Sequence, residues 1–219
     1  MSKSLRISIL SQEESWINSF LRKWVEELLD RFQVNFVHQE INVGSGDILF
    51  ILSYWQKVSN NTLDKFTSPV VVHESELPKG RGWSPVSWAV LEGSNQISIV
   101  LFKATPQIDQ GEIYLKDYIY LEGHELIDEI RAKQAYKTID LCNRFIKEYP
   151  QILNYGVAQA GEPTYLRRRT PKDSQLDIHK SIYEQLNLLR ISDNEKYPAF
   201  FEYLGKKYII KIYKEDAQP

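Results

Sequence analysis

The sequence predicts an α/β fold, with a Rossmann-like, mostly parallel sheet flanked by helices. Three short apolar runs carry this prediction, at 46–52, 69–73 and 97–102. Their hydrophobic character is continuous rather than alternating, which is typical of strands buried on both faces of a parallel sheet. Stretches with helical periodicity separate the strand-like segments, and this alternation indicates an α/β architecture.

The first expected element is a strand at 5–10, and the polar run 11–15 after it suits a helix start. A helix then extends to about residue 32. Its apolar residues recur at steps of three and four and form one face: Trp16, Ile17, Phe20, Leu21, Trp24, Val25, Leu28 and Leu29. Further along, Ser84 and Pro85 resemble an N-cap and a first-turn proline, so we expect a short helix through residue 91.

The second half begins with a helix predicted from 126 to about 149, ended by Pro150. Residues 153–173 contain glycines, prolines and three consecutive arginines, which indicates a loop-rich segment. A short helical stretch is expected at 178–189, and 200–212 reads as a β-hairpin that turns near 204–206. We therefore expect a catalytic core at 1–152 and a small C-terminal extension at 153–219.

The composition excludes several classes of protein. With 27 basic and 29 acidic residues the formal net charge is -2, which argues against a nucleic-acid binder. The single Cys142 lies in an apolar-periodic run and is expected to be a buried thiol. His38, His124 and His179 have no ligand-spaced partners, so no metal site is expected. The start of the chain lacks the apolar block of a signal peptide, and no run approaches the ~18 apolar residues that span a bilayer, so we expect a cytoplasmic protein with no membrane partner.

The position of the candidate site follows from the sheet, because ligands in such folds lie beyond the carboxyl ends of the strands. This rule points to Tyr54 and Trp55, to His73 and the loop after it, and to the residues after Phe102. No G-x-G-x-x-G follows the first strand, so the usual dinucleotide signature is missing. From the residues alone, His73 is either a ligand-facing side chain or a hydrogen-bonded loop histidine. Asp109 is likewise either functional or a turn-forming aspartate.

One segment resembles a known signature. Residues 73–85, His-Glu-Ser-Glu-Leu-Pro-Lys-Gly-Arg-Gly-Trp-Ser-Pro, are similar to the H-x-S-x-L-P-x-x-R-G-x-x-P motif of the 10-formyltetrahydrofolate-dependent formyltransferases. Residues 109–113 match that family's D-x-G-x-I segment, and 88–93 match its helix and closing glycine. Segments 169–173 and 197–201 resemble elements of the methionyl-tRNA and sugar-nucleotide branches. The resemblance covers most of the chain and is strongest from 70 to 115.

The resemblance implies that His73 and Asp109 carry the proton chemistry of formyl transfer to an amine. His73 would act as general base or oxyanion stabiliser and Asp109 as proton relay, because the attacking nitrogen must lose a proton and the folate nitrogen must gain one. It also implies contacts with the donor, 10-formyltetrahydrofolate, from Tyr54, Trp55, Leu77 and Asp109. The aromatic residues have core packing as their alternative.

Contacts with the acceptor are expected from Ser75, Lys79, Arg81 and Trp83. Lys79 and Arg81 suit a diphosphate, with a solvated loop, or a tie between loop and sheet, as the alternative. The triple arginine 167–169 suits either a phosphate or a charged surface turn.

Val71 departs from the resemblance, since the family usually has an asparagine there that helps to hold the formyl oxygen. Loss of a preorganised donor of this kind costs about 2.7–4 kcal/mol of transition-state stabilisation when nothing replaces it. We favour the interpretation that His73, Ser75 or a backbone N–H replaces the asparagine as donor to the formyl oxygen. The alternative is a weak or degenerate enzyme that binds folate or a nucleotide sugar.

The acceptor is inferred from the C-terminal segment. Methionyl-tRNA formyltransferases carry a sizeable, basic C-terminal domain, and purine-pathway enzymes generally lack the elements seen at 169–173 and in the hairpin. The resemblance therefore favours a sugar N-formyltransferase acting on a nucleotide-linked 4-amino-4,6-dideoxy sugar. The sequence of residues 73–85 is most similar to that of formyltransferases in pseudaminic-acid-type pathways. The acceptors of these enzymes include a UDP-linked 4-amino-4,6-dideoxy-AltNAc. Met-tRNA and glycinamide ribotide remain alternatives, and the aromatic hairpin suggests a homodimer.

Overall fold

The computed structural model describes residues 4–215 and contains a six-stranded sheet in the order β2-β1-β3-β4-β6-β7. Its strands are β1 (Arg6–Leu10), β2 (Gln33–Val37), β3 (Gly46–Ile51), β4 (Phe66–His73), β6 (Gln96–Lys103) and β7 (Ile113–Tyr120). All neighbours from β2 to β4 are parallel, whereas β6 is antiparallel to both β4 and β7. The predicted α/β class with a mostly parallel sheet is confirmed.

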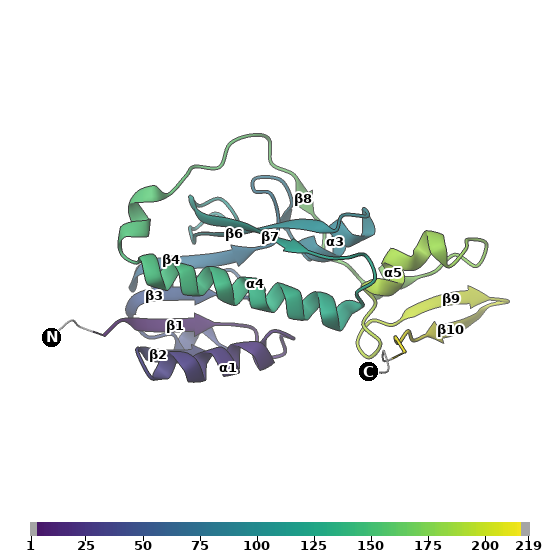
Figure 1. Cartoon of the computed structure of the whole chain (residues 1–219), viewed down its shortest axis with the longest axis horizontal. Helices are drawn as coiled ribbons and strands as arrows, with labels where there is room; N and C mark the ends of the chain where they lie inside the picture. Colours follow the sequence, from purple (N-terminus) through teal and green to yellow (C-terminus); the bar gives the residue numbers. More distant parts are fainter. Residues whose placement is uncertain (1–3, 216–219) are drawn as a thin grey trace.

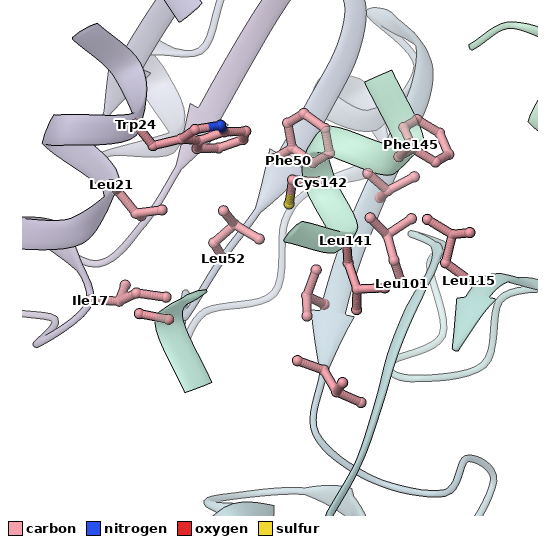
Figure 2. Close-up of a cluster of buried hydrophobic side chains, with 14 of the residues drawn as sticks. Ile17, Leu21, Trp24, Phe50, Leu52, Leu101, Leu115, Leu141, Cys142 and Phe145 are labelled. Carbon is pink, nitrogen blue, oxygen red and sulfur yellow. The ribbon is translucent and has the colours of Figure 1, made fainter. Parts of the chain in front are cut away.

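Two helices, α1 (Asn18–Leu29) and α4 (Ile127–Glu148), pack on one face of the sheet. Figure 2 shows their side chains meeting those of β3, with Trp24 of α1 near Phe50 and with Phe145 on the α4 side. The indole Nε1 of Trp24 also donates to Asn143 Oδ1 at 2.8 Å, which joins the helices directly. Cys142 lies in this core with no exposed surface, as predicted.

The other face of the sheet is covered by a smaller apolar cluster, under η1 (Glu40–Asn42), the loops and α2 (Asn60–Leu63). Alternation along β3 produces this division, because Ile48 and Phe50 face α1 and α4 while Leu49 and Ile51 face the smaller cluster. Burial on both faces explains why these strands are continuously apolar. In the part of the chain that the structure describes, no helix is both long and apolar enough to cross a membrane.

The direction of β6 differs from the expectation for 97–102. Its register places His73 opposite Val100 and Val70 opposite Lys103, so β6 runs back toward the start of β4. The residues after Phe102 therefore do not follow a parallel strand. A continuous apolar run reports burial on both faces and carries no information on strand direction, which explains the error.

Smaller expectations also need correction. Ser84 precedes α3 (Pro85–Leu91) with a left-handed φ of 52°, and its side chain makes no capping hydrogen bond. The helix expected at 178–189 begins late, as η4 (Tyr183–Gln185) followed by α5 (Leu186–Arg190). Strands β2 and β7 had not been predicted. β2 is only half-buried, and this weakens its apolar pattern.

The segment after α4 contains η2 (Gln151–Tyr155), β8 (Tyr165–Leu166) and η3 (Pro171–Ser174). β8 pairs in parallel with β5 (Arg81–Gly82), which holds this segment against the loop that follows β4. The predicted hairpin is confirmed as β9 (Ala199–Tyr203) and β10 (Lys206–Ile210), and it lies at one end of the molecule (Figure 1). Its turn residues Leu204 and Gly205 have φ of 48° and 71°, as favoured two-residue hairpin turns require. Residues 1–3, at the start of the stretch assessed for a signal peptide, and 216–219 lie outside this description.

A buried ionic cluster joins α5 to the loop before α4. The side chain of Glu125 is 2% exposed and accepts hydrogen bonds from Lys133 and from the backbone N–H groups of Glu122 and Gly123. Arg190 of α5 lies 3.5 Å from the same carboxylate and donates its Nε–H to the Glu125 carbonyl. Burial raises the pKa of Glu125, but the Lys133 ammonium and the N–H donors outweigh it and lower that pKa to about 2.

We predict that Glu125→Gln lowers the free energy of unfolding at pH 7 by roughly 3 kcal/mol, because it leaves Lys133 and Arg190 without their counter-charge. The folded pKa of Glu125 is depressed from 4.5 to about 2, so its contribution is complete above pH 4.5 and is lost as the pH falls toward 2. Urea unfolding of both proteins across this range measures the difference. A difference that stays constant with pH would contradict the assignment.

Candidate active site

One large cavity of about 870 Å³ lies where β3 and β4 end, between α3, α4, the loop after β6 and the C-terminal segment. Five of the residues predicted for the site line it: Tyr54, Trp55, His73, Trp83 and Asp109. The sequence therefore identified a group of side chains that the fold brings together from four separate segments.

His73 is the last residue of β4 and is 7% exposed. Its Nε2 lies 2.8 Å from the carbonyl oxygen of Gly80, in the loop that folds back after the strand. A carbonyl oxygen only accepts, so Nε2 carries the hydrogen and donates it. In the neutral ring Nδ1 is then the nitrogen that can receive a proton. The contact therefore fixes both the orientation and the tautomer of the imidazole.

Asp109 lies in the loop after β6, with a left-handed φ of 55°. Its Oδ2 accepts the backbone N–H of Gly82 at 3.0 Å, which connects it to the loop that follows His73. Close packing holds this loop, because a Cβ on Gly111 would lie 1.8 Å from the carbonyl oxygen of Lys103. Gly111 is therefore required by space as well as by the motif.

Gln159 links these two loops. Its Nε2 donates to the carbonyl oxygens of Asp109 and Gly111, each at 3.0 Å, and its Oε1 accepts from the guanidinium of Arg81 at 2.7 Å. Arg81 is buried and does not line the cavity. Arg81 therefore has a structural role and does not face a diphosphate in the cavity. Its partner, Gln159, lies in the C-terminal segment, whereas the alternative from sequence placed that partner in the sheet.

Three further residues predicted to bind ligand also lie outside the cavity. Leu77 packs on Val100 and Phe102 over the sheet, Ser75 is buried, and Lys79 is exposed. The motif fixes which residues belong to this loop, but the direction each side chain takes depends on how the loop folds back.

Two of the three arginines for which the sequence left a phosphate contact and a charged surface turn open reach the cavity. The guanidinium of Arg168 lies 4.9 Å from the ring centre of Trp83, and both line the cavity. Arg169 is half-buried, its Nε has no hydrogen-bond partner within residues 4–215, and burial lowers its pKa. Arg167 instead pairs with Asp173 and covers Trp88. The run 167–169 was the available signal, but a run alone does not show which side chains face inward.

Glu74 is a cavity residue to which sequence reasoning gave no role. It directly follows His73, is half-buried and lines the cavity. Burial raises the pKa of its carboxyl, with Asp109 adding to the effect, while His73 and a hydrogen bond with Gln134 oppose it. Within residues 4–215 it forms no salt bridge.

Val71 also lines the cavity, on the same strand face as His73. The position at which the resemblance expects an asparagine is thus an apolar part of the cavity wall. Across the described range, no group of three or more His, Cys, Asp or Glu side chains is arranged to hold a metal ion.

Comparisons with known proteins give consistent results, although no family model matches the sequence. The chain is similar to the bifunctional polymyxin resistance protein ArnA of Wigglesworthia glossinidia brevipalpis, with 29% identity over 170 residues that cover 75% of this chain and 25% of that protein. It is 27% identical to a methionyl-tRNA formyltransferase of Coprothermobacter proteolyticus over 121 residues, which cover 55% of this chain and 40% of that protein. The chain thus spans between a quarter and two-fifths of the length of these relatives.

Among solved structures, the methionyl-tRNA formyltransferase from Clostridium thermocellum has a TM-score of 0.77 at 19% identity, covering 98% of this chain and 95% of that one. A sugar N-formyltransferase from a Shewanella species has a TM-score of 0.70 at 14% identity, covering 98% and 99%. HypX from Aquifex aeolicus in complex with tetrahydrofolic acid has a TM-score of 0.73 at 15% identity, covering 96% and 38%. At such identities these structures establish the fold.

The sequence likeness covers 75% of the chain and the fold likeness covers nearly all of it. The similarity of segments 73–85 and 109–113 to the formyltransferase motif is therefore part of a relationship that extends over the fold. The homologues of this chain and its structural neighbours are members of the formyltransferase family.

Proposed function

We propose that the protein transfers a formyl group from 10-formyltetrahydrofolate to the amine of a nucleotide-linked 4-amino-4,6-dideoxy sugar. The observation that carries this proposal is the position of His73 and Asp109 in one cavity of about 870 Å³. Each residue alone has a structural explanation, but a buried histidine and an aspartate that share a ligand-sized cavity provide the proton acceptor and the proton relay that the reaction needs.

The chemistry follows from the geometry of His73. With Nε2 bound to the Gly80 carbonyl, Nδ1 is the atom that takes a proton from the attacking amine. The charged imidazolium then stabilises the negative oxygen that develops on the formyl carbon. Asp109, held by the N–H of Gly82, delivers a proton to the leaving nitrogen. The donor itself supplies the formyl carbon.

The donor fits the side of the cavity that follows β3. Tyr54 and Trp55 line this part, and their rings suit a flat heterocycle such as a pterin. The solved HypX structure that shares this fold contains tetrahydrofolic acid, which supports a folate as the donor. Tyr54, Trp55 and Asp109 would contact the donor. Leu77, also expected to do so, packs against the sheet instead.

The acceptor fits the C-terminal side of the cavity. Arg168 and Arg169 bring positive charge there, as a nucleotide diphosphate requires. They replace Lys79 and Arg81 as the residues that would contact the diphosphate. Trp83, already covered by Arg168, offers a surface for a base. A near-neutral chain with net charge -2 is poorly suited to tRNA, which favours a small acceptor.

A second candidate function rests on Val71. If no other donor replaces the expected asparagine, the protein binds a folate or a nucleotide sugar without efficient transfer.

We also propose that residues 153–219 form a small extension of a core at 1–152, and that the protein is a homodimer. The hairpin exposes four large residues that a second copy would cover: Tyr203, Leu204, Tyr208 and Ile209.

A panel of acceptors tests the main proposal. We predict formylation of a UDP- or dTDP-linked 4-amino-4,6-dideoxy sugar, with 10-formyltetrahydrofolate as donor, measured by mass spectrometry as the gain of one formyl group. Formylation of Met-tRNA or glycinamide ribotide instead would contradict the choice of acceptor. Tight binding of folate with no transfer to any amine would favour the second candidate.

Variants test the roles of the two central residues. We predict that His73→Ala and Asp109→Asn each lower kcat/KM by about 10²-fold or more, the usual contribution of acid–base catalysis. Asp109→Asn retains an acceptor for the Gly82 N–H and removes only the charge. His179→Ala and Asp64→Asn, both exposed and outside the cavity, are the matched controls. Rates equal to wild type in either site variant would refute its role.

A further inference from the structure

Glu74 lies on a different side of His73 from the expected donor-binding residues. Side chains alternate along β4, so Val70 and Val72 face the core under α4 while Val71 and His73 face the other way. Glu74 directly follows β4, and its carboxyl lies close enough to Gln134 of α4 for that side chain to lower its pKa. It therefore approaches the centre of the cavity from the α4 side and does not occupy the place of the missing asparagine.

Thr138 is a second polar residue with which α4 lines the cavity, after Gln134. It follows Gln134 by one helical turn and is 2% exposed. Its Oγ1 is buried and makes no hydrogen bond with the described protein atoms. A buried hydroxyl without a hydrogen bond carries a desolvation penalty, which a ligand that reaches it would remove.

The charge of Glu74 is also unbalanced. Arg131 is the basic residue with which α4 lines the cavity, and its guanidinium is already paired with Asp193 at 2.8 Å. The apolar residues Ile17 and Ile130 form part of the same wall. An enclosed carboxylate of this kind is stabilised when a cation binds to it. A primary ammonium supplies both that charge and three hydrogen-bond donors.

We propose that Glu74 binds the ammonium group of the acceptor and takes its first proton. This rests on the function proposed above. In that reaction the acceptor enters as R–NH₃⁺ and gives one proton to the Glu74 carboxylate. The freed lone pair forms the new bond to the formyl carbon as the bond from that carbon to the folate nitrogen breaks. A second proton passes from the amine to the folate nitrogen through His73 and Asp109, and Glu74 returns its proton to solvent.

The proposal gives Gln134 and Thr138 a role as well. Their amide and hydroxyl contact the polar substituent next to the amine, because both side chains line the same cavity from α4. The raised pKa of Glu74 agrees with a group that accepts a proton readily, and binding of a cation would lower that pKa again.

The test compares an acceptor with its deaminated counterpart. UDP- and dTDP-linked 4-amino-4,6-dideoxy sugars are titrated by calorimetry into the full chain, beside the same sugars with a hydroxyl in place of the amine. We expect the wild type to prefer the amine by about 10- to 100-fold, as a charge-assisted hydrogen bond provides. Glu74→Gln should abolish most of this preference while the affinity for tetrahydrofolate stays unchanged.

The controls separate a local effect from a folding defect. Glu76→Gln makes the same change two residues along the loop, where the carboxylate is exposed and pairs with Lys116 outside the cavity. It should keep the full preference for the amine. Glu74→Asp should retain part of it, because the charge remains but lies farther from the ligand. If Glu74→Gln does not fold, Glu74→Asp provides the comparison, because a partial loss of the preference for the amine is expected there.

The outcomes distinguish this inference from the proposed function. If the wild type transfers the formyl group and folded Glu74→Gln keeps its preference for the amine and its kcat/KM, the inference is wrong and the proposed function stands. If the preference depends on Glu74 but no transfer occurs, the ammonium site stands and the proposed function fails. A wild type that binds amine and hydroxyl forms equally, or binds neither, overturns the inference.

Discussion

The candidate site depends on the side-chain amide of Gln159. Its oxygen accepts from Arg81 and its nitrogen donates to the carbonyl groups of Asp109 and Gly111, so one rigid planar group sets the distance between two loops. Those loops follow β4 and β6, which run in opposite directions. Nothing in the sheet itself would bring His73 and Asp109 together. The bond from Gly82 N–H to the Asp109 carboxylate then orients the side chain within that frame.

The cavity has an uneven distribution of charge. Arg168 and Arg169 lie on the side formed by the C-terminal segment, whereas Glu74 lies on the side formed by α4 and has no salt-bridge partner within residues 4–215. A ligand with an anionic end and a cationic end would be oriented by this field before any specific contact forms. A nucleotide-linked amino sugar, the acceptor that we propose, has both ends.

Much of the fold could be predicted, because burial leaves a clear periodic pattern. β3, β4, α1 and α4 all carry it. The direction of β6 could not be predicted, since burial on both faces is the same for parallel and antiparallel strands. In the site, the motif pointed to His73 and Asp109, which the fold places in one cavity, but it could not show that Ser75, Leu77, Lys79 and Arg81 lie outside that cavity. Glu74 occupies a variable position of the motif, and a run of arginines suits a surface turn equally well, so neither gave a specific signal.

The wall of the cavity is closed by residues from both ends of the described chain. Lys196 donates to the carbonyl oxygen of Glu14, across 182 positions of sequence, and both residues line the cavity. A contact of such long range closes a large loop, and the entropy cost of that closure must be offset by other structure. A molecule bound in this cavity therefore holds the first strand–helix unit and the hairpin segment in one cooperative structure. Its binding energy adds to the stability of the whole chain rather than to that of one loop.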